Sequence, residues 1–278
     1  MSRPVTTTSD PEPDQQPHRW DEHVTLYEDV FEPLTQNFAL AAIEALSLGP
    51  RSRVLDSGAG AGGAALELAR RGHGVTAIDA SMAMVRRAKE RASTAGLTVE
   101  VLTMNGQDLS LPDASFDAAL SVLGVILFPN AVRGLSELRR AVKPGGRIAL
   151  VTWTAPEAYE LIGELRAAAI SLLGSLPSRP LPALLRFKEK DDFQALLAAA
   201  GLPAPEIAEV AGELVAPSPA WLAERLAFAP GMAALLEGFG AARAEVVSAF
   251  RKRLEARGSG PVALLARAYV GTVTVARN

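Results

Sequence analysis

The sequence predicts an α/β protein with a largely parallel sheet that is covered by helices on both faces. Apolar strands alternate with helical segments from about residue 50 to residue 153. The strands are apolar throughout instead of alternating between apolar and polar residues, which is typical of parallel sheets buried on both sides. A glycine-rich turn follows the first strand, where open α/β sheets bind their ligands.

Five strands are expected in this region, each followed by a turn or a helix. They are "RVLDSG" (53–58), "GVTAIDAS" (74–81), "TVEVLTM" (98–104), "FDAALSVLG" (116–124) and "GRIALVTW" (146–153). The helix between the first two strands is stopped by Gly72. The next begins at Ser81, a plausible N-cap, and stops at Gly96. The order strand, helix, strand therefore continues through the whole region.

The flanking segments differ in composition. Residues 1–17 are rich in Pro, Thr, Asp and Gln, which predicts a disordered tail. Apolar residues recur at helical spacing over 18–49, and Pro33 is expected to divide two helices there. After residue 153 we expect further helices, a strand in "PEIAEVAGELV", a helical insertion at about 218–257 and a last strand. Residues 18–278 are read as a single domain.

Composition excludes several classes of function. The chain has 278 residues, of which 49% are hydrophobic and 21% charged, and its formal net charge is −3. It has no cysteine, so disulfides, zinc–thiolate sites and cysteine nucleophiles are excluded, and no metal site is predicted. The sequence has no stripe of basic residues of the kind that binds nucleic acids, so no nucleic-acid partner is expected. The sequence shows neither a membrane span nor a signal peptide, so we expect a cytoplasmic protein.

The glycine-rich turn carries the strongest chemical signal. Gly58, Gly60 and Gly63 form a G-x-G-x-x-G pattern, and Asp79 follows the first glycine by 21 positions. This spacing is the fingerprint of dinucleotide-binding proteins, in which the acidic residue binds the ribose. A carboxylate at the end of the second strand can accept both ribose hydroxyls. An adenosine-type ligand is therefore expected, with or without a pyrophosphate.

Asp56 separates these two possibilities. It stands two residues before the first glycine, where its negative charge would repel a pyrophosphate. The same charge favours a ligand that carries positive charge and no phosphate. S-adenosylmethionine is such a ligand, because it has an ammonium and a sulfonium group. A structural role for Asp56, capping the amides of the loop, is compatible with this interpretation.

Four motifs in order resemble those of class I S-adenosylmethionine-dependent methyltransferases. They are "VLDSGAGAGG", "VTAIDASMAMVRRAK", "MNGQDLSLPDASFDAALS" and "LSELRRAVKPGGRIALVTW". The similarity is greatest to the branch that methylates small molecules, including quinone-pathway and natural-product enzymes. It implies a Rossmann-like, doubly wound, mostly parallel seven-stranded sheet. It also implies an N-terminal helical lid over 18–49, a cofactor-binding core over 50–153 and a C-terminal half over 154–278.

The resemblance also implies a set of cofactor contacts. Asp56 would lie beside the ammonium group, directly or through water, Asp79 would bind the ribose, and Tyr27 would reach the methionine carboxylate. Asn105 stands where many relatives have aspartate, but its carbonyl can still accept from adenine. The full set of expected cofactor-binding residues is Tyr27, Asp56, Gly58, Ala59, Gly60, Asp79, Ala80, Met84, Asn105, Gly106, Gln107, Ser121 and Val122.

Methyl transfer needs alignment of the acceptor more than it needs a catalytic group. We therefore expect in-line transfer to O, N or C of a small, fairly apolar acceptor. His23 is the best candidate for a base, and the candidates for an acceptor wall are Trp20, Phe31, Phe128 and Trp153. A homodimer is possible. Two alternatives stay open, namely non-methylating chemistry such as cyclisation of the cofactor or a substrate, and, less favoured, a nicotinamide-dependent oxidoreductase.

Overall fold

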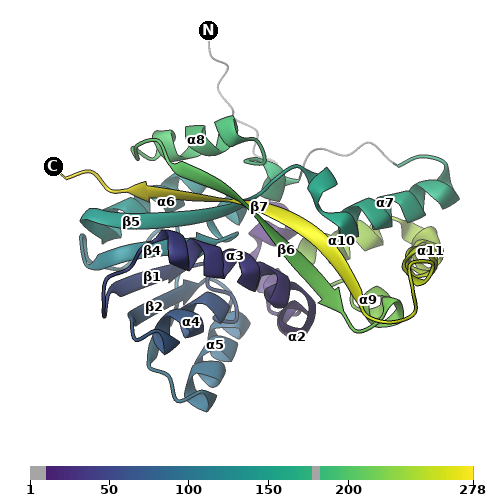
Figure 1. Ribbon diagram of the computed structural model, residues 1–278, viewed down its shortest axis with the longest axis horizontal. Helices are drawn as coiled ribbons and strands as arrows, with labels where there is room; N and C mark the ends of the chain where they lie inside the picture. Colours follow the sequence, from purple (N-terminus) through teal and green to yellow (C-terminus); the bar gives the residue numbers. More distant parts are fainter. Residues whose placement is uncertain (1–10, 177–181, 278) are drawn as a thin grey trace, which may run out of the picture.

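The computed structural model describes residues 11–176 and 182–277, and its strands form one sheet of seven in the order β3-β2-β1-β4-β5-β7-β6 (Figure 1). Strands β1 to β5 run parallel, and β7 pairs antiparallel with both β5 and β6. The fold predicted from the sequence is confirmed. The strands are β1 Arg53–Ser57, β2 Gly74–Asp79, β3 Val99–Thr103, β4 Phe116–Val122, β5 Val142–Trp153, β6 Glu206–Ala216 and β7 Val262–Thr274.

Helices cover both faces of this sheet. On one face, α3, α4 and α5 pack on strand residues such as Val54 and Ala118, whereas α6 and α8 pack on Leu55 and Ala119 on the other. Successive strand residues point to opposite faces, so burial on both sides requires an apolar residue at nearly every strand position. The helices are α1 Pro17–Trp20, α2 Val24–Leu26, α3 Glu32–Ala45, α4 Gly63–Arg70, α5 Met82–Thr94, α6 Ala131–Ala141, α7 Glu160–Leu173, α8 Lys190–Ala199, α9 Pro219–Glu224, α10 Pro230–Glu237 and α11 Arg243–Glu255.

Strands β6 and β7 extend beyond the other strands. The first residues of β7, from Val262 on, pair with β6 alone, and only Ala268–Thr274 also pair with β5. Figure 1 shows this ribbon running out of the sheet toward α9 and α11. The helices α9 to α11 lie between the two strands in sequence, at 219–255, close to the predicted insertion at 218–257. The insertion therefore stands at one end of the sheet.

The N-terminal region departs from the sequence prediction in two ways. The chain does not break into two helices at Pro33, because a π-helix, Tyr27–Phe31, continues directly into α3. Pro33 stands at the second position of α3, where the π-helical turn changes to α-helix, so it lies within a continuous helical segment. The predicted disordered tail is wrong for residues 11–17, which include a 3-10 helix over Pro13–Gln15 and the start of α1. Residues 1–10 lie outside the described part.

Side-chain contacts fix residues 11–17 against distant elements. The Glu12 carboxylate accepts from the backbone N–H of Ala183 at 2.8 Å. Asp14 accepts from the N–H of Gly231 in α10 at 2.7 Å. Composition carries no information about such tertiary contacts, which here override a disorder-like sequence. None of the helices within residues 11–176 and 182–277 has the length and apolar character that a bilayer crossing requires.

Helix α3 supplies the first testable consequence of this packing. Phe38 is fully buried and meets the Trp153 ring edge-on at 5.8 Å, whereas Leu40 on the same helix is 38% exposed. We expect Phe38→Ala to lower the free energy of unfolding by about 3–5 kcal/mol, because it leaves a cavity. The control Leu40→Ala should change it by less than about 1 kcal/mol. Urea denaturation measures both, and equal losses would contradict this packing.

Candidate functional site

A cavity opens at the carboxyl ends of β1, β2 and β4. Because β1 lies between β2 and β4, this is the point where the strand order reverses and where open α/β sheets bind ligands. The lining combines the glycine turn, the ends of these strands and the N-terminal helices. It consists of Asp14, Gln15, Pro17, Trp20, Tyr27, Phe31, Thr35, Gly58, Gly60, Asp79, Ala80, Met84, Met104, Asn105, Gly106, Gln107, Val122, Leu123, Gly124, Leu127, Phe128 and Pro129.

The glycine turn has a backbone that requires glycine at two positions. Gly58 and Gly60 have φ values of +72° and +55°, in the left-handed region that L-residues rarely occupy. The chain also passes close to its neighbours there. A Cβ atom on Gly58 would lie 2.9 Å from Cα of Gly124, and one on Gly60 would lie 2.9 Å from the Tyr27 hydroxyl oxygen. The turn thus brings backbone, and not side chain, to the wall of the cavity.

Three N–H groups of this turn already donate hydrogen bonds within the protein. The N–H groups of Gly58 and Ala59 both point to the carbonyl of Ile78, at 2.9 and 3.0 Å. The N–H of Gly60 donates to Oδ2 of Asp79 at 2.9 Å. A pyrophosphate site needs free N–H groups or cations. These three amides are not free, and no Lys or Arg is among the described lining residues.

Asp79 is positioned to bind a diol. Its Oδ1 accepts from the N–H of Ser81 at 2.8 Å and its Oδ2 accepts from Gly60, so each oxygen keeps acceptor capacity for one more donor. Burial raises the pKa of this carboxyl, and the N–H groups of Ser81 and Gly60 partly offset the effect. Two neighbouring hydroxyls of a ribose match this pair of acceptors.

Asp56 lies at the end of β1 beneath the glycine turn and outside the lining of the cavity. It is only 1% exposed, and its Oδ2 has no hydrogen-bond partner. Burial and then the charge of Asp79 raise its pKa to about 7, while the backbone N–H of Ala65 lowers it. Asp56 is not among the described lining residues, so of the two modes expected from the sequence, direct contact and contact through water, this geometry favours the second. Asp56 can act through its charge or through water.

Aromatic side chains of the N-terminal helices form the opposite wall. The Trp20 and Tyr27 rings meet edge-on with centroids 6.0 Å apart, and Tyr27 and Phe31 meet at 5.8 Å. Burial raises the pKa of the Tyr27 hydroxyl far above its usual range, and Glu32 adds to this effect. Tyr27 is therefore neutral at physiological pH. This wall offers apolar surface with one hydroxyl group.

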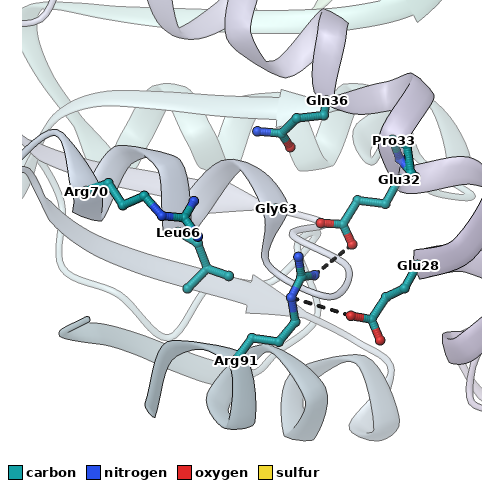
Figure 2. A pocket seen from close by; sticks show the side chains of 8 residues that line it. All are labelled: Glu28, Glu32, Pro33, Gln36, Gly63, Leu66, Arg70 and Arg91. Atoms are coloured by element: carbon teal, nitrogen blue, oxygen red, sulfur yellow. Dashed lines mark hydrogen bonds and ion pairs between the residues drawn. The ribbon is translucent and has the colours of Figure 1, made fainter. Parts of the chain in front are cut away.

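Charged side chains fasten these N-terminal helices to α5. Figure 2 shows Arg91 of α5 pointing toward Glu28 and Glu32, with its nitrogens 3.4 and 2.7 Å from the two carboxylates. Arg91 also donates to the carbonyl of Ala61 in the glycine turn at 2.8 Å. Nearby, Asp21 accepts from the Ser81 hydroxyl at 2.6 Å. The N-terminal helices and the glycine turn are thus joined by one network.

Most of the predicted site residues gather at the cavity. Ala80, Met84, Gly106, Gln107, Val122 and Phe128 line it together with the residues described above. Asn105 lines it too, but its Oδ1 accepts from the backbone N–H of Gln107 at 2.9 Å and so shapes its own turn. Adenine recognition by the Asn105 side chain would compete with this bond.

Besides Asp56, four predicted residues lie outside the lining. The Ser121 hydroxyl donates to the carbonyl of Ser57 at 2.6 Å and accepts from Val125, so it fixes the backbone. Trp153 stacks on Tyr159 at 5.3 Å within the core. Nδ1 of His23 lies 2.8 Å from the carbonyl of Ala227, so the histidine links the N-terminal helices to the insertion. The fourth, Ala59, contributes an amide to the turn.

Other lining residues were not predicted from the sequence. Three of them come from the segment expected to be disordered, namely Asp14, Gln15 and Pro17. No motif or apolar pattern in that segment predicts that it lines a site. Gly124 was also missed. A Cβ atom there would lie 2.8 Å from the carbonyl oxygen of Ser57, so close packing requires glycine at this position. This contact can be recognised only in the folded structure.

The comparisons with known proteins agree with this geometry. Residues 54–146 match the family model described as a methyltransferase domain. This part of the chain, about a third of its length, is similar to methyltransferase domains. The match agrees with the family that the four motifs resemble and with S-adenosylmethionine as the expected cofactor.

The relatives and solved structures extend the comparison. An uncharacterised protein of Mycobacterium tuberculosis is 31% identical over 161 residues, which are 58% of this chain and 57% of that protein. The ubiquinone/menaquinone biosynthesis C-methyltransferase of Geotalea daltonii is 29% identical over 58% of this chain and 74% of its own. The (4+2)-cyclase SpnF has the same fold, with a TM-score of 0.64, 21% identity and coverage of 96% and 97%. The matched region covers little more than half the length of the Mycobacterium tuberculosis relative.

The buried Asp56 carboxyl predicts a specific pH dependence of stability. Its pKa is raised from 3.8 to about 7, so its contribution to stability is fully present below about pH 4 and is lost as pH rises through 7. Relative to Asp56→Asn, the wild-type protein without ligand should lose roughly 2–4 kcal/mol of unfolding free energy over this range.

Denaturation at a series of pH values measures this difference. Asp108→Asn is the matched control, because its carboxylate is 78% exposed. It should keep the pH dependence of the wild-type protein. Parallel stability curves for the wild-type protein and Asp56→Asn would show that Asp56 is not the buried acid described here.

Proposed function

We propose that this protein transfers the methyl group of S-adenosylmethionine to an O, N or C atom of a small, fairly apolar metabolite, in quinone-type or secondary metabolism. One observation carries this proposal above the others. The cavity places a diol-binding carboxylate, Asp79, beside a glycine turn whose first amides are all donated within the protein, with the carboxyl of Asp56 beneath it. Such a site favours an adenosine ligand with positive charge and without phosphate.

The residues present fit this cofactor. Asp79 would take the ribose hydroxyls, and Ala80 and Met84 would pack on the adenine ring. Gly58 and Gly60 would face the methionine portion of the cofactor. Oδ2 of Asp56, which has no hydrogen-bond partner, would place negative charge beneath the turn when the carboxyl is ionised. When bound, the cofactor supplies an electrophilic methyl carbon activated by its positively charged sulfur.

The protein's own contribution is alignment and exclusion of water. Trp20, Tyr27 and Phe31 cover the cavity from the N-terminal side, and the Arg91 network holds these helices to the glycine turn. In-line transfer requires the attacking atom to approach opposite the leaving sulfur, so a closed apolar chamber raises the rate by orientation. The apolar lining suits an acceptor with an aromatic or quinone-like ring.

A second function remains testable because a protein named as a (4+2)-cyclase shares the fold. Incubation with S-adenosylmethionine alone and then with apolar metabolites separates the two. Methyl transfer yields S-adenosylhomocysteine only when an acceptor is added. Cyclisation of the aminobutyrate arm yields methylthioadenosine without one. A substrate cyclase forms a product while the cofactor stays intact.

Asp79 gives the sharpest test of the cofactor site. We expect Asp79→Asn to weaken binding of S-adenosylmethionine by at least about 100-fold, because two hydrogen bonds to a charged acceptor are lost or weakened. Isothermal titration calorimetry measures the affinity, and circular dichroism checks that the variant is folded.

Asp108→Asn, a change of the same kind on an exposed carboxylate, should bind like the wild-type protein. Tighter binding of a nicotinamide dinucleotide than of S-adenosylmethionine by the wild-type protein would overturn the proposed function. Unchanged affinity in Asp79→Asn would remove Asp79 from the site.

A further inference from the structure

The segment over residues 11–20 brings a second acidic side chain to the cavity. Asp14 and Asp79 are the two carboxylates among the described lining residues. Asp79 accepts hydrogen bonds from the backbone N–H groups of Gly60 and Ser81. Asp14 stands on the wall made by the N-terminal segment, together with Gln15 and Trp20. Asp14 is therefore among the residues that an acceptor entering the cavity would meet.

Asp14 is held in one position by its neighbours. Its Oδ1 accepts from the backbone N–H of Gly231 at 2.7 Å, and its own carbonyl accepts from Nε1 of Trp20 at 3.0 Å. Gly231 has no side chain at this point of contact. A Cβ atom there would overlap Oδ2 of Asp14. The absence of a side chain on Gly231 thus sets where the carboxylate lies.

The charges around Asp14 leave it without a cationic partner. Glu12, on the same segment, adds negative charge, and α10 offers only the backbone of Gly231. Arg186, a cation whose pKa burial lowers and the charge of Glu12 raises, donates to the carbonyls of Ile126 and Phe128. Among the described residues, Asp14 forms no ion pair, and its side-chain hydrogen bond is to the backbone of Gly231. Burial, with a smaller effect of Glu12, raises the pKa of Asp14 to about 6.

Resting on the proposed methyl transfer, we propose that Asp14 is the base that accepts the proton of a hydroxyl acceptor, a phenol or enol carried on an apolar ring. The apolar surfaces of Trp20, Phe31 and Phe128 suit such a ring. A hydroxyl brings one donor, which one carboxylate satisfies. An ammonium acceptor would bring three donors to a wall that offers, beside Asp14, mainly the amide of Gln15.

The step balances with the groups named. The hydroxyl oxygen of the acceptor forms a bond to the methyl carbon, and the bond from that carbon to sulfur breaks with its electron pair going to sulfur. The hydroxyl proton moves to the carboxylate of Asp14 and later to solvent. The products are the methyl ether, neutral S-adenosylhomocysteine and one proton. A carboxylate that is ionised at neutral pH but has a raised pKa suits this transfer.

The test uses a series of apolar phenols of graded acidity as acceptors. With weakly acidic phenols, Asp14→Asn should lower kcat/KM by about 100-fold and abolish the rise of wild-type rate through pH 6. With phenols acidic enough to be ionised already, the loss should be less than about threefold, because no proton remains to be taken. Gly231→Ala should behave like Asp14→Asn, because it displaces the carboxylate.

Two further measurements keep a structural effect apart from a chemical one. Glu12→Gln removes a charge from the same segment and keeps an acceptor for Ala183, so it should retain kcat. In ¹³C NMR of protein labelled at its aspartate carboxyls, Asp14→Asn should delete one resonance that titrates near pH 6. Calorimetry should show binding of S-adenosylmethionine within about threefold of wild type for Asp14→Asn.

The contrary outcomes are distinct. Equal losses on weakly and strongly acidic phenols, a rise in KM alone, or wild-type activity on amines but not on phenols would each overturn the role of Asp14. So would a tenfold or greater loss of cofactor affinity in Asp14→Asn, which would place Asp14 in the cofactor site. Failure of the wild-type protein to bind S-adenosylmethionine would instead overturn the proposed function itself.

Discussion

A buried carboxyl and a half-buried one, near the ends of neighbouring parallel strands, govern the organisation of this protein. Asp56 is the last residue but one of β1 and Asp79 is the last residue of β2, and the pairing of these strands brings both under one glycine turn. Burial and the charge of Asp79 raise the pKa of Asp56, whereas burial and the charge of Asp21 raise the pKa of Asp79. The sheet thus holds negative charge at its ligand edge at an energetic cost, which a cationic ligand can offset.

The surrounding structure protects this negative edge. Two amides of the turn, those of Gly58 and Ala59, donate to the carbonyl of Ile78 and not to these carboxyls. The nearby guanidinium groups are directed elsewhere, since Arg87 and Arg91 pair with Glu28 and Glu32 of the N-terminal helices. These ion pairs therefore hold the N-terminal helices beside the cavity, and no Lys or Arg is among its described lining residues. Helix α5 thus supplies Met84 to the lining of the cavity and also the arginines that attach the N-terminal helices.

The sheet and the cofactor loop could be predicted because their signals are local. Continuous apolar runs identify parallel strands, and the spacing from Gly58 to Asp79 reflects one strand–turn–helix–strand unit. The tail could not be predicted, because Glu12 and Asp14 are ordered by bonds to Ala183 and Gly231, far along the chain. Similarly, nothing in the local sequence places His23 against Ala227.

Trp153 and Ser121 show a second limit of sequence reasoning. Both end strands near the cavity, yet one stacks on Tyr159 in the core and the other bonds to the backbone of Ser57. The side of the sheet that a side chain faces depends on register, which shifts between β4 and β5 near Phe116. Residue type and position in a strand are therefore weaker guides to a site than the strand order itself.

Proton release on cofactor binding tests most directly whether the buried negative charge selects the ligand. Calorimetry of S-adenosylmethionine binding at about pH 7, in buffers of different ionisation enthalpy, counts the protons exchanged. Because the pKa of Asp56 is about 7 without ligand, a cationic ligand should ionise it and release protons, and Asp56→Asn should abolish that release. Proton uptake, or the same release in Asp56→Asn, would contradict the central role of this charge.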